Sequence, residues 1–235
     1  MCRNGISMTG RILKAMSHTI KKMFRRLNPA VPPAMVQAGR EETGTDLAML
    51  LNELLVSELF TESASLTKEQ LKGSAVRNCL LQAMMLLDRK YIVGFAMKNF
   101  SEEGLAEYGE SIRGCCSDKQ SVLLRSAVQY LTDAFPEKDK GLTGISIPML
   151  LYLADVAEDA EISPALFRRW WEFFRSEDAL YENYRRFCGS DFAELETVNG
   201  RLNVMAESFC NYHEIEIPEE LEGTTGEVAR RKTGT

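Results

Sequence analysis

The chain has 235 residues, of which 45% are hydrophobic and 26% charged, a composition typical of a globular protein rather than a disordered one. No apolar run approaches the roughly 20 residues that span a bilayer, and the N-terminus lacks the apolar stretch of a secretory signal, so we expect a cytoplasmic protein. The net charge of −6 hides an asymmetry. Residues 1–40 contain eight basic and no acidic residues, whereas residues 41–235 hold the other 20 basic and all 34 acidic residues, a net −14. A basic head on an acidic body predicts contact with phosphate, with an acidic partner, or with the body or a sister subunit.

Hydrophobic periodicity predicts helices along nearly the whole chain. An amphipathic helix is expected over residues 8–28, with apolar residues at three-and-four spacing. Asn28-Pro29 ends it, because proline excludes the helical conformation from the residue before it. A capping-box pattern at Thr67–Gln70 predicts the start of a later helix. Beyond the linker at Pro29–Pro33, the helices expected as far as the middle of the chain cover residues 45–60, 67–87, 91–97, 101–114 and 119–135.

Two serine–proline patterns mark further helix starts in the last third of the chain. Ser146-Ile-Pro148 and Ser163-Pro164 each combine a capping serine with a proline in the first turn. A helix around residues 180–187 is expected to end at the following Cys-Gly pair, and the final helix covers residues 195–209. After Pro218 the sequence has no apolar periodicity.

The predicted fold is therefore all-α. We expect a single multi-helix domain of about seven to nine helices, with a basic N-terminal helix and a disordered C-terminal tail. The expected divisions are residues 1–33 for the basic helix and proline linker, residues 34–217 for the helical domain, and residues 218–235 for the tail.

Motifs that carry common enzyme chemistry are missing from the sequence. It has no phosphate-cradling glycine loop, no Gly-x-Ser-x-Gly elbow and no His-Glu-x-x-His. His18 and His213 are expected at the surface, because nothing in the sequence supplies a catalytic partner. The six cysteines form no Cys-x-x-Cys pair and are expected to be buried or incidental thiols. We predict no catalytic residue, no metal site and no cofactor.

The segment Phe167–Ser176, FRRWWEFFRS, has two interpretations. Aromatic rings and arginines suit stacking on bases and pairing with phosphates. However, Phe167, Trp170, Trp171 and Phe174 share one helix face, so we expect them in the core with the three arginines outside.

The segment KKMFRRLN, residues 21–28, is the best electrostatic candidate for nucleic-acid contact. Its basic residues cluster within about two helical turns, and the apolar residues between them form the other face. Since no DNA-reading module is visible, such contact would be made to the backbone and would depend on salt. The expected nucleic-acid-binding residues are Lys21, Lys22, Arg25 and Arg26, and the expected partner interface consists of Met23, Phe24 and Leu27.

Two stretches resemble GmrSD-like proteins of the ParB/sulfiredoxin superfamily. Residues 23–41, MFRRLNPAVPPAMVQAGRE, look like the segment that follows the catalytic core of those proteins. Residues 162–205 are similar to the helical tail of some members, in which a tryptophan-rich helix precedes a Cys-Gly-Ser turn and a helix with Gly-Arg-Leu. The residues that carry the likeness are Phe24, Arg26, Leu27, Asn28, Gln37, Arg40, Cys188, Gly189, Ser190, Gly200, Arg201 and Leu202.

The chain also departs from that family. Members carry an Asp-Gly-Gln-Gln-Arg motif in the domain that hydrolyses nucleotide and supports DNA restriction, and this sequence has neither that motif nor a His-Asn-His signature. The resemblance therefore implies a non-catalytic helical subunit or remnant of a phage-defence protein. It would act through a separate ParB-like partner or by self-association, and would meet DNA within that complex. Two alternatives stay open: an independent helical interaction or regulatory protein of a phage or mobile element, and an enzyme with an unrecognised helical active site.

Overall fold

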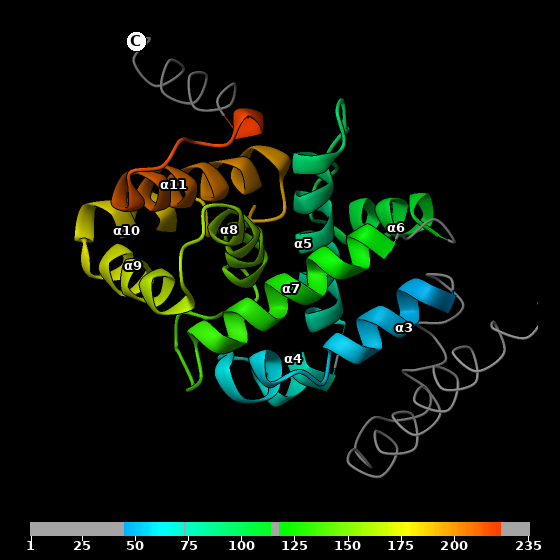
Figure 1. Cartoon of the computed structure of the whole chain (residues 1–235). Coiled ribbons are helices and arrows are strands. Elements are labelled where there is room, and N and C mark those ends of the chain that lie inside the picture. Colours follow the sequence, from blue (N-terminus) through cyan, green and yellow to red (C-terminus); the bar gives the residue numbers. More distant parts are fainter. Residues whose placement is uncertain (1–44, 73, 114–117, 222–235) are drawn as a thin grey trace, which may run out of the picture. The chain divides into compact units, whose positions relative to one another are not determined.

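The computed structural model describes residues 45–72, 74–113 and 118–221 (Figure 1). These described residues form ten helices and no strand, which confirms the all-α prediction. They all fall within one compact unit. The predicted helix over residues 8–28 lies outside the described residues.

The helices agree with the expected ones over most of the described chain. In chain order they are α3 (Thr45–Leu54), the π-helix η1 (Leu59–Ser63), α4 (Lys68–Lys72), α5 (Ala75–Tyr91), α6 (Glu102–Ser111), α7 (Asp118–Ala134), α8 (Ile147–Asp159), α9 (Pro164–Ser176), α10 (Asp178–Arg185) and α11 (Leu195–His213).

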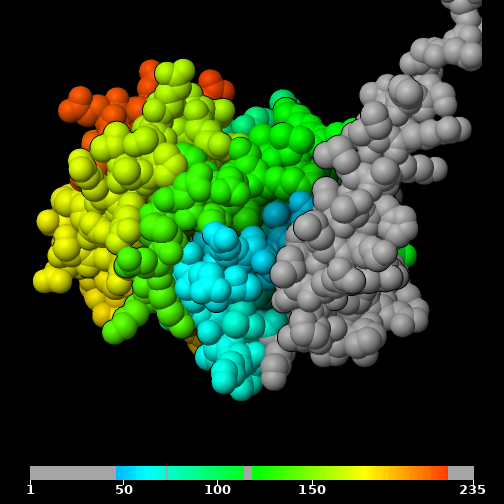
Figure 2. Space-filling view, turned by 60° about the horizontal axis from the view of Figure 1, so that its bottom comes forward, coloured from blue at the N-terminus to red at the C-terminus, as the bar shows by residue number. Residues whose placement is uncertain are grey.

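Helix α8 forms the centre of this part of the molecule. Every residue from Ile147 to Ala157 is buried, so α8 is covered on all sides rather than along one stripe. It packs against α5, α7 and α11, and α9 packs in turn on α7 and α11. Figure 1 views α8 nearly along its axis, with these four helices around it. On the outer face, the surface of α7 lies beside that of α3 and η1 (Figure 2).

Two predicted helix starts have their expected capping hydrogen bonds. At α4, the Thr67 hydroxyl accepts from the Gln70 N–H, while the Gln70 side-chain oxygen accepts from the Thr67 N–H. This reciprocal pair is the predicted capping box. At α9, the Ser163 hydroxyl accepts from the Leu166 N–H. Both pairs satisfy backbone donors that a helix leaves unpaired in its first turn.

The start of α8 differs from the prediction. The Ser146 hydroxyl donates to the Gly141 carbonyl and accepts from the Thr143 N–H, and it makes no capping bond to α8. Ser146 therefore stabilises the loop that precedes the helix. Pro148 does lie in the first turn as expected, where its missing N–H leaves no unpaired donor.

Two of the predicted helices are each divided. The helix expected over residues 45–60 ends at Leu54, and η1 begins at Leu59. The helix expected over residues 67–87 is divided into α4, which ends at Lys72, and α5, which begins at Ala75, and in the sequence Gly73 comes between them. Glycine is a poor helix former, which favours a division at this point.

The prediction of a helix over residues 91–97 is wrong. Helix α5 ends at Tyr91, and a turn and an extended loop follow. Gly94 has a φ of 76°, a conformation that glycine adopts readily and that a right-handed helix excludes. Ile92 and Val93 are exposed, so the apolar run does not indicate burial.

The chain after α11 also differs from the prediction of a tail that is disordered from Pro218 onward. Residues 219–221 form a short helical turn, and Leu221 is fully buried. Residues 222–235 lie outside the described part of the chain.

Helix α9 places four of its five aromatic side chains in the core, and these are the four that were expected there. Phe167, Trp170, Trp171 and Phe174 are all fully buried, whereas Leu166, which begins the same apolar pattern, is exposed. Since these four rings are inaccessible, the structure contradicts the interpretation that they stack on nucleic-acid bases.

The turn after α10 packs on α11 at Gly200 and Arg201, two of the residues that carry the family resemblance. A Cβ at Gly200 would lie 2.4 Å from Cε1 of Phe187, so only glycine leaves room for this ring. Arg201 is 1% exposed, and its Nη1 donates to the Phe187 carbonyl over 2.7 Å. Burial lowers the pKa of Arg201, and its Nε has no hydrogen-bond partner among the described residues. Gly200 and Arg201 of α11 therefore both contact Phe187, the residue directly before the Cys-Gly-Ser turn.

We expect Gly200→Ala to lower the free energy of unfolding by about 1–3 kcal/mol, the usual cost of overpacking a core. This outcome reverses the ordinary preference of a helix for alanine over glycine. Urea denaturation of Gly200→Ala, Phe187→Leu and the double variant measures the effect. The loss caused by Gly200→Ala should shrink in the Phe187→Leu background, because the clashing ring is gone. Equal losses in both backgrounds would contradict this packing.

Candidate functional site

The last turn of α5 carries four consecutive polar residues, Asp88–Tyr91, which bond to several other elements. Successive helical side chains point about 100° apart, so the four diverge toward different neighbours. Together with their side-chain partners they form what we call the α5 polar cluster. Its members are Asp88, Arg89, Lys90, Tyr91, Tyr108, Lys119, Gln120, Tyr152, Asp155, Asp159, Asn199 and Glu220.

Asp88 connects α5 to α6 and α7. Its carboxylate accepts hydrogen bonds from the Tyr108 hydroxyl at 2.8 Å and from Gln120 Nε2 at 2.7 Å. The residue is almost completely buried. Burial raises the pKa of Asp88, although the hydrogen bonds from Gln120 and Tyr108 oppose that shift by stabilising the charged form.

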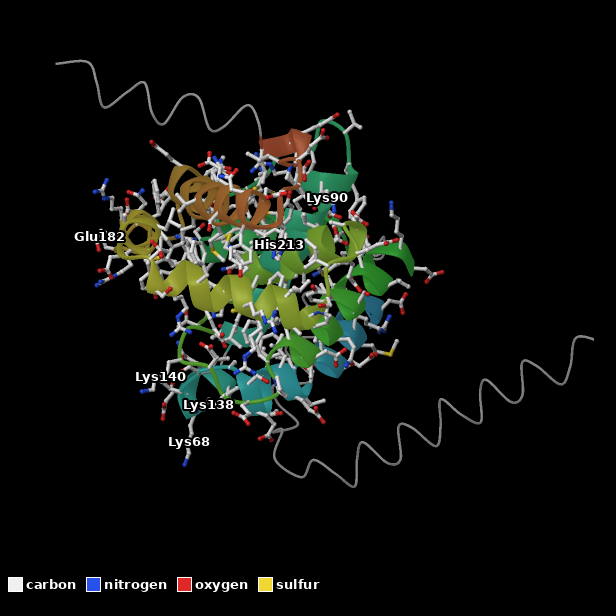
Figure 3. All side chains as sticks on the ribbon, turned by 60° about the vertical axis from the view of Figure 1, so that its left-hand side comes forward. Lys68, Lys90, Lys138, Lys140, Glu182 and His213 are labelled. Carbon is white, nitrogen blue, oxygen red and sulfur yellow. The ribbon has the colours of Figure 1, made fainter. Side chains whose placement is uncertain are left out.

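Lys90 connects α5 to α8, at the position labelled in Figure 3. Its ammonium lies 2.6 Å from a carboxylate oxygen of Asp155 and 2.6 Å from one of Asp159. The Asp155 side chain is 4% exposed and that of Asp159 63%, so the pair with Asp155 is the one shielded from water. Burial by itself lowers the pKa of Lys90, but the two carboxylates outweigh it and raise the pKa above its ordinary value.

Tyr91 extends the Lys90 group toward α7. Its hydroxyl donates to Asp155 over 2.9 Å, and the ammonium of Lys119 lies 4.4 Å from the centre of its ring. An ammonium at this distance from an aromatic face is attracted by the negative charge density of the ring. Burial, and next the charge of Asp155, raise the pKa of Tyr91 to about 12.

Arg89 connects α5 to α11 and to the segment beyond it. Its Nη1 donates to Oδ1 of Asn199 and its Nη2 to the Glu220 carbonyl, both over 2.7 Å. The Glu220 carboxylate in turn accepts from the hydroxyl of Tyr152, which lies on the buried helix α8. Burial lowers the pKa of Arg89, while the charges of Tyr152 and Glu220 oppose that shift.

These contacts determine what the α5 polar cluster can do chemically. Lys90 carries a raised pKa and stays protonated at neutral pH, so it is neither a nucleophile nor a general base. Arg89 and Asp155 each bond to partners within the chain. Charged groups that are paired and hydrogen-bonded in this way hold helices in place. The arrangement is structural in character.

The residues predicted from sequence for nucleic-acid and partner contact lie outside the described part of the chain. They are Lys21, Lys22, Arg25 and Arg26 for nucleic acid, and Met23, Phe24 and Leu27 for a partner. His18 lies there as well.

His213 differs from the expected surface residue. Its ring is half-buried at the end of α11, with the Phe209 ring 4.7 Å away and the Tyr212 ring 4.9 Å away between centroids. Its Nε2 is buried without a hydrogen-bond partner among the described residues. Burial lowers the pKa of His213, which favours the neutral ring.

The cysteines within the described ranges are free thiols. Cys79 and Cys210 are buried and Cys188 is half-buried. Cys79 donates to the Gly144 carbonyl, and burial raises its pKa to about 12, so it is an unreactive thiol. No group of three or more His, Cys, Asp or Glu side chains among the described residues could hold a metal ion.

An exposed apolar strip runs along α9 and the end of α11. Leu166 and Phe173 lie seven residues apart on one face of α9, and the Phe173 ring lies 5.0 Å from the Tyr212 ring between centroids. All three side chains are exposed. Aromatic and aliphatic groups gathered in this way suit contact with an apolar surface of another protein. We call these three residues the α9 strip.

Three exposed lysines lie together on another side, a feature that the sequence analysis did not anticipate. Figure 3 shows Lys68, Lys138 and Lys140 near one another, away from Lys90. Backbone hydrogen bonds join their two segments, from Asp139 to Ser63 and from Ser65 to Leu142. The neighbouring acidic residues Glu69 and Glu137 offset part of the positive charge, and Asp139 pairs with Arg175, so this surface is a weaker phosphate candidate than residues 21–28.

The chain matches no protein-family model, no curated protein and no solved structure. Among its described helices, none is both long and apolar enough to cross a membrane.

Asp88 predicts a specific dependence of stability on pH. Its folded pKa is raised, so its protonated form is favoured in the folded state, and its contribution to stability is lost as pH rises from the ordinary aspartate pKa of about 4 through the raised value. Asp88→Asn keeps an acceptor for Gln120 and removes the titration. We expect the stability of Asp88→Asn relative to wild type to increase with pH across that window and then to level off. Urea denaturation of both proteins at a series of pH values measures this difference in stability. A difference that does not change with pH would contradict a raised pKa for Asp88.

Proposed function

We propose that this chain is a non-catalytic helical subunit that acts by binding a separate partner protein. The observation that carries the proposal is the α5 polar cluster, in which Lys90 bonds to two carboxylates and Arg89 bonds to an amide oxygen and a main-chain carbonyl of the same chain. Groups committed to internal pairing hold helices together and are poorly suited to acid–base or nucleophilic work. The α9 strip supports the same proposal by offering an apolar surface to a partner.

In its narrower form, the proposal takes the class of partner from the family resemblance. The partner would be a ParB-like protein that carries the Asp-Gly-Gln-Gln-Arg motif, and the pair would act as a restriction-type phage-defence protein. The support is the likeness of residues 23–41 and 162–205 to GmrSD-like proteins. The basic head would supply backbone contacts to DNA within that complex.

Calorimetric titration of the full-length chain with a separately encoded ParB-like protein of the same genome tests the partner. We expect a saturable complex. Phe24→Asp should weaken it at least about tenfold, because it places a charge in the expected apolar interface. Phe192→Asp, at an exposed phenylalanine outside both the α9 strip and the head, serves as the matched control. Nucleotide hydrolysis by the chain alone, or a chain that stays monomeric and binds no ParB-like protein, would refute the proposal.

Fluorescence anisotropy with a labelled DNA duplex tests the basic head. We expect binding by the full chain that weakens steeply with salt and is independent of base sequence. Replacing Lys21, Lys22, Arg25 and Arg26 with glutamine should abolish it. Replacing Lys68, Lys138 and Lys140 with glutamine is the control, since these lysines lie among acidic residues, and it should leave the affinity within about twofold of the wild-type value. If only the control variant lost binding, the phosphate contact would lie at Lys68, Lys138 and Lys140 of the helical domain and not at the basic head.

A further inference from the structure

The segment that follows α11 runs back toward the α5 polar cluster. Glu214 ends α11 in the left-handed conformation, with a φ of 55°, and turns the chain around. Residues 215–218 have no regular secondary structure, and residues 219–221 form the short turn that meets α5 (Figure 1). Arg89 contacts both this turn, at Glu220, and the beginning of α11, at Asn199. We call residues 215–221 the arm.

The end of the arm is held by three contacts of different chemistry. Its backbone carbonyl at Glu220 accepts from Nη2 of Arg89 over 2.7 Å. Its carboxylate at Glu220 accepts from the Tyr152 hydroxyl over 2.5 Å. Leu221 is fully buried. Together these contacts recognise a main-chain carbonyl, a glutamate side chain and a leucine side chain that follow one another directly.

The groups that hold the arm would stay in place if the arm left. Arg89 remains bonded to Asn199, and Tyr152 belongs to the buried helix α8. Without Glu220, the Tyr152 hydroxyl and Nη2 of Arg89 would each lose an acceptor and would bond to water instead, and a carboxylate or carbonyl that replaces this water restores the original hydrogen bonds. The vacated site would therefore favour a ligand that restores the same bonds.

We propose that Arg89, Tyr152 and the surface beneath Leu221 form a peptide-binding site, which the chain fills with its own arm and which a Glu-Leu segment of another protein occupies in its place. Release of the arm breaks no helix of the domain, because residues 215–218 have no regular secondary structure, although Ile215 and Ile217 must leave their packing against the core. As a tethered ligand, it competes at an effective concentration in the millimolar range. The site rests on these contacts and is independent of the proposed ParB-like partner.

The test uses a fluorescein-labelled peptide, IEIPEELE, which copies residues 215–222, and the full-length chain. Anisotropy titration should show that the chain with both Glu220→Ala and Leu221→Ala binds the peptide at least about tenfold more tightly than wild type, because its own arm no longer competes. Glu219→Ala, at an exposed neighbouring glutamate, is the matched control and should bind as weakly as wild type.

The role of the peptide's glutamate is tested with the Glu220→Ala/Leu221→Ala double variant, in which the arm no longer competes. The peptide IEIPEALE, which lacks the glutamate that contacts Tyr152, should bind at least about tenfold more weakly than IEIPEELE. Adding Tyr152→Phe to the double variant should reduce this preference. Absence of saturable binding to a folded double variant, or equal affinity for the two peptides, would overturn the proposal.

Hydrogen exchange on the wild-type chain keeps the test decisive if the double variant does not fold. Unlabelled IEIPEELE at several millimolar, near the effective concentration of the arm, should accelerate exchange in residues 215–221, because the peptide displaces the arm. IEIPEALE at the same concentration should not. Identical exchange of the arm with and without IEIPEELE would overturn the proposal.

Discussion

Burial of charge at the end of α5 is the constraint on which the placement of the surrounding helices depends. Helix α8 is covered on every side, yet it carries Asp155 and Tyr152, whose polar atoms must find partners inside the protein. Lys90 and Tyr91 supply bonds to Asp155, and Glu220 accepts from Tyr152. Because each bond tolerates only a narrow range of geometry, the polar cluster fixes the register between helices that apolar packing alone would leave adjustable.

The all-α fold and much of its core follow from local pattern. The buried face of α9 can be read from aromatic residues at helical spacing, and its start from Ser163-Pro164. The errors occur where a wider context decides. Residues 91–97 are apolar enough for a helix, but Gly94 adopts a positive φ and the run stays exposed. The division between Leu54 and Leu59 has no local signal in the sequence.

The α5 polar cluster was much less accessible to prediction than the fold. Its only local signal is four polar residues, Asp88–Tyr91, directly after a strongly apolar stretch of the same helix. Their partners lie far along the chain: Gln120 is 32 residues from Asp88, and Glu220 is 131 residues from Arg89. Pairings at such separations depend on the tertiary fold. The sequence instead predicted a site in the basic head, because the charge of residues 1–40 can be counted without knowledge of the fold.

The aromatic core of α9 has a consequence for spectroscopy. The chain contains two tryptophans, Trp170 and Trp171, and both are fully buried, with Nε1 of Trp170 donating to the Ser208 hydroxyl of α11. Intrinsic emission therefore reports on the junction of α9 and α11 and will shift to longer wavelength when water reaches it. The basic head and the arm contain no indole. A fluorescence measurement on either segment therefore needs an engineered fluorophore.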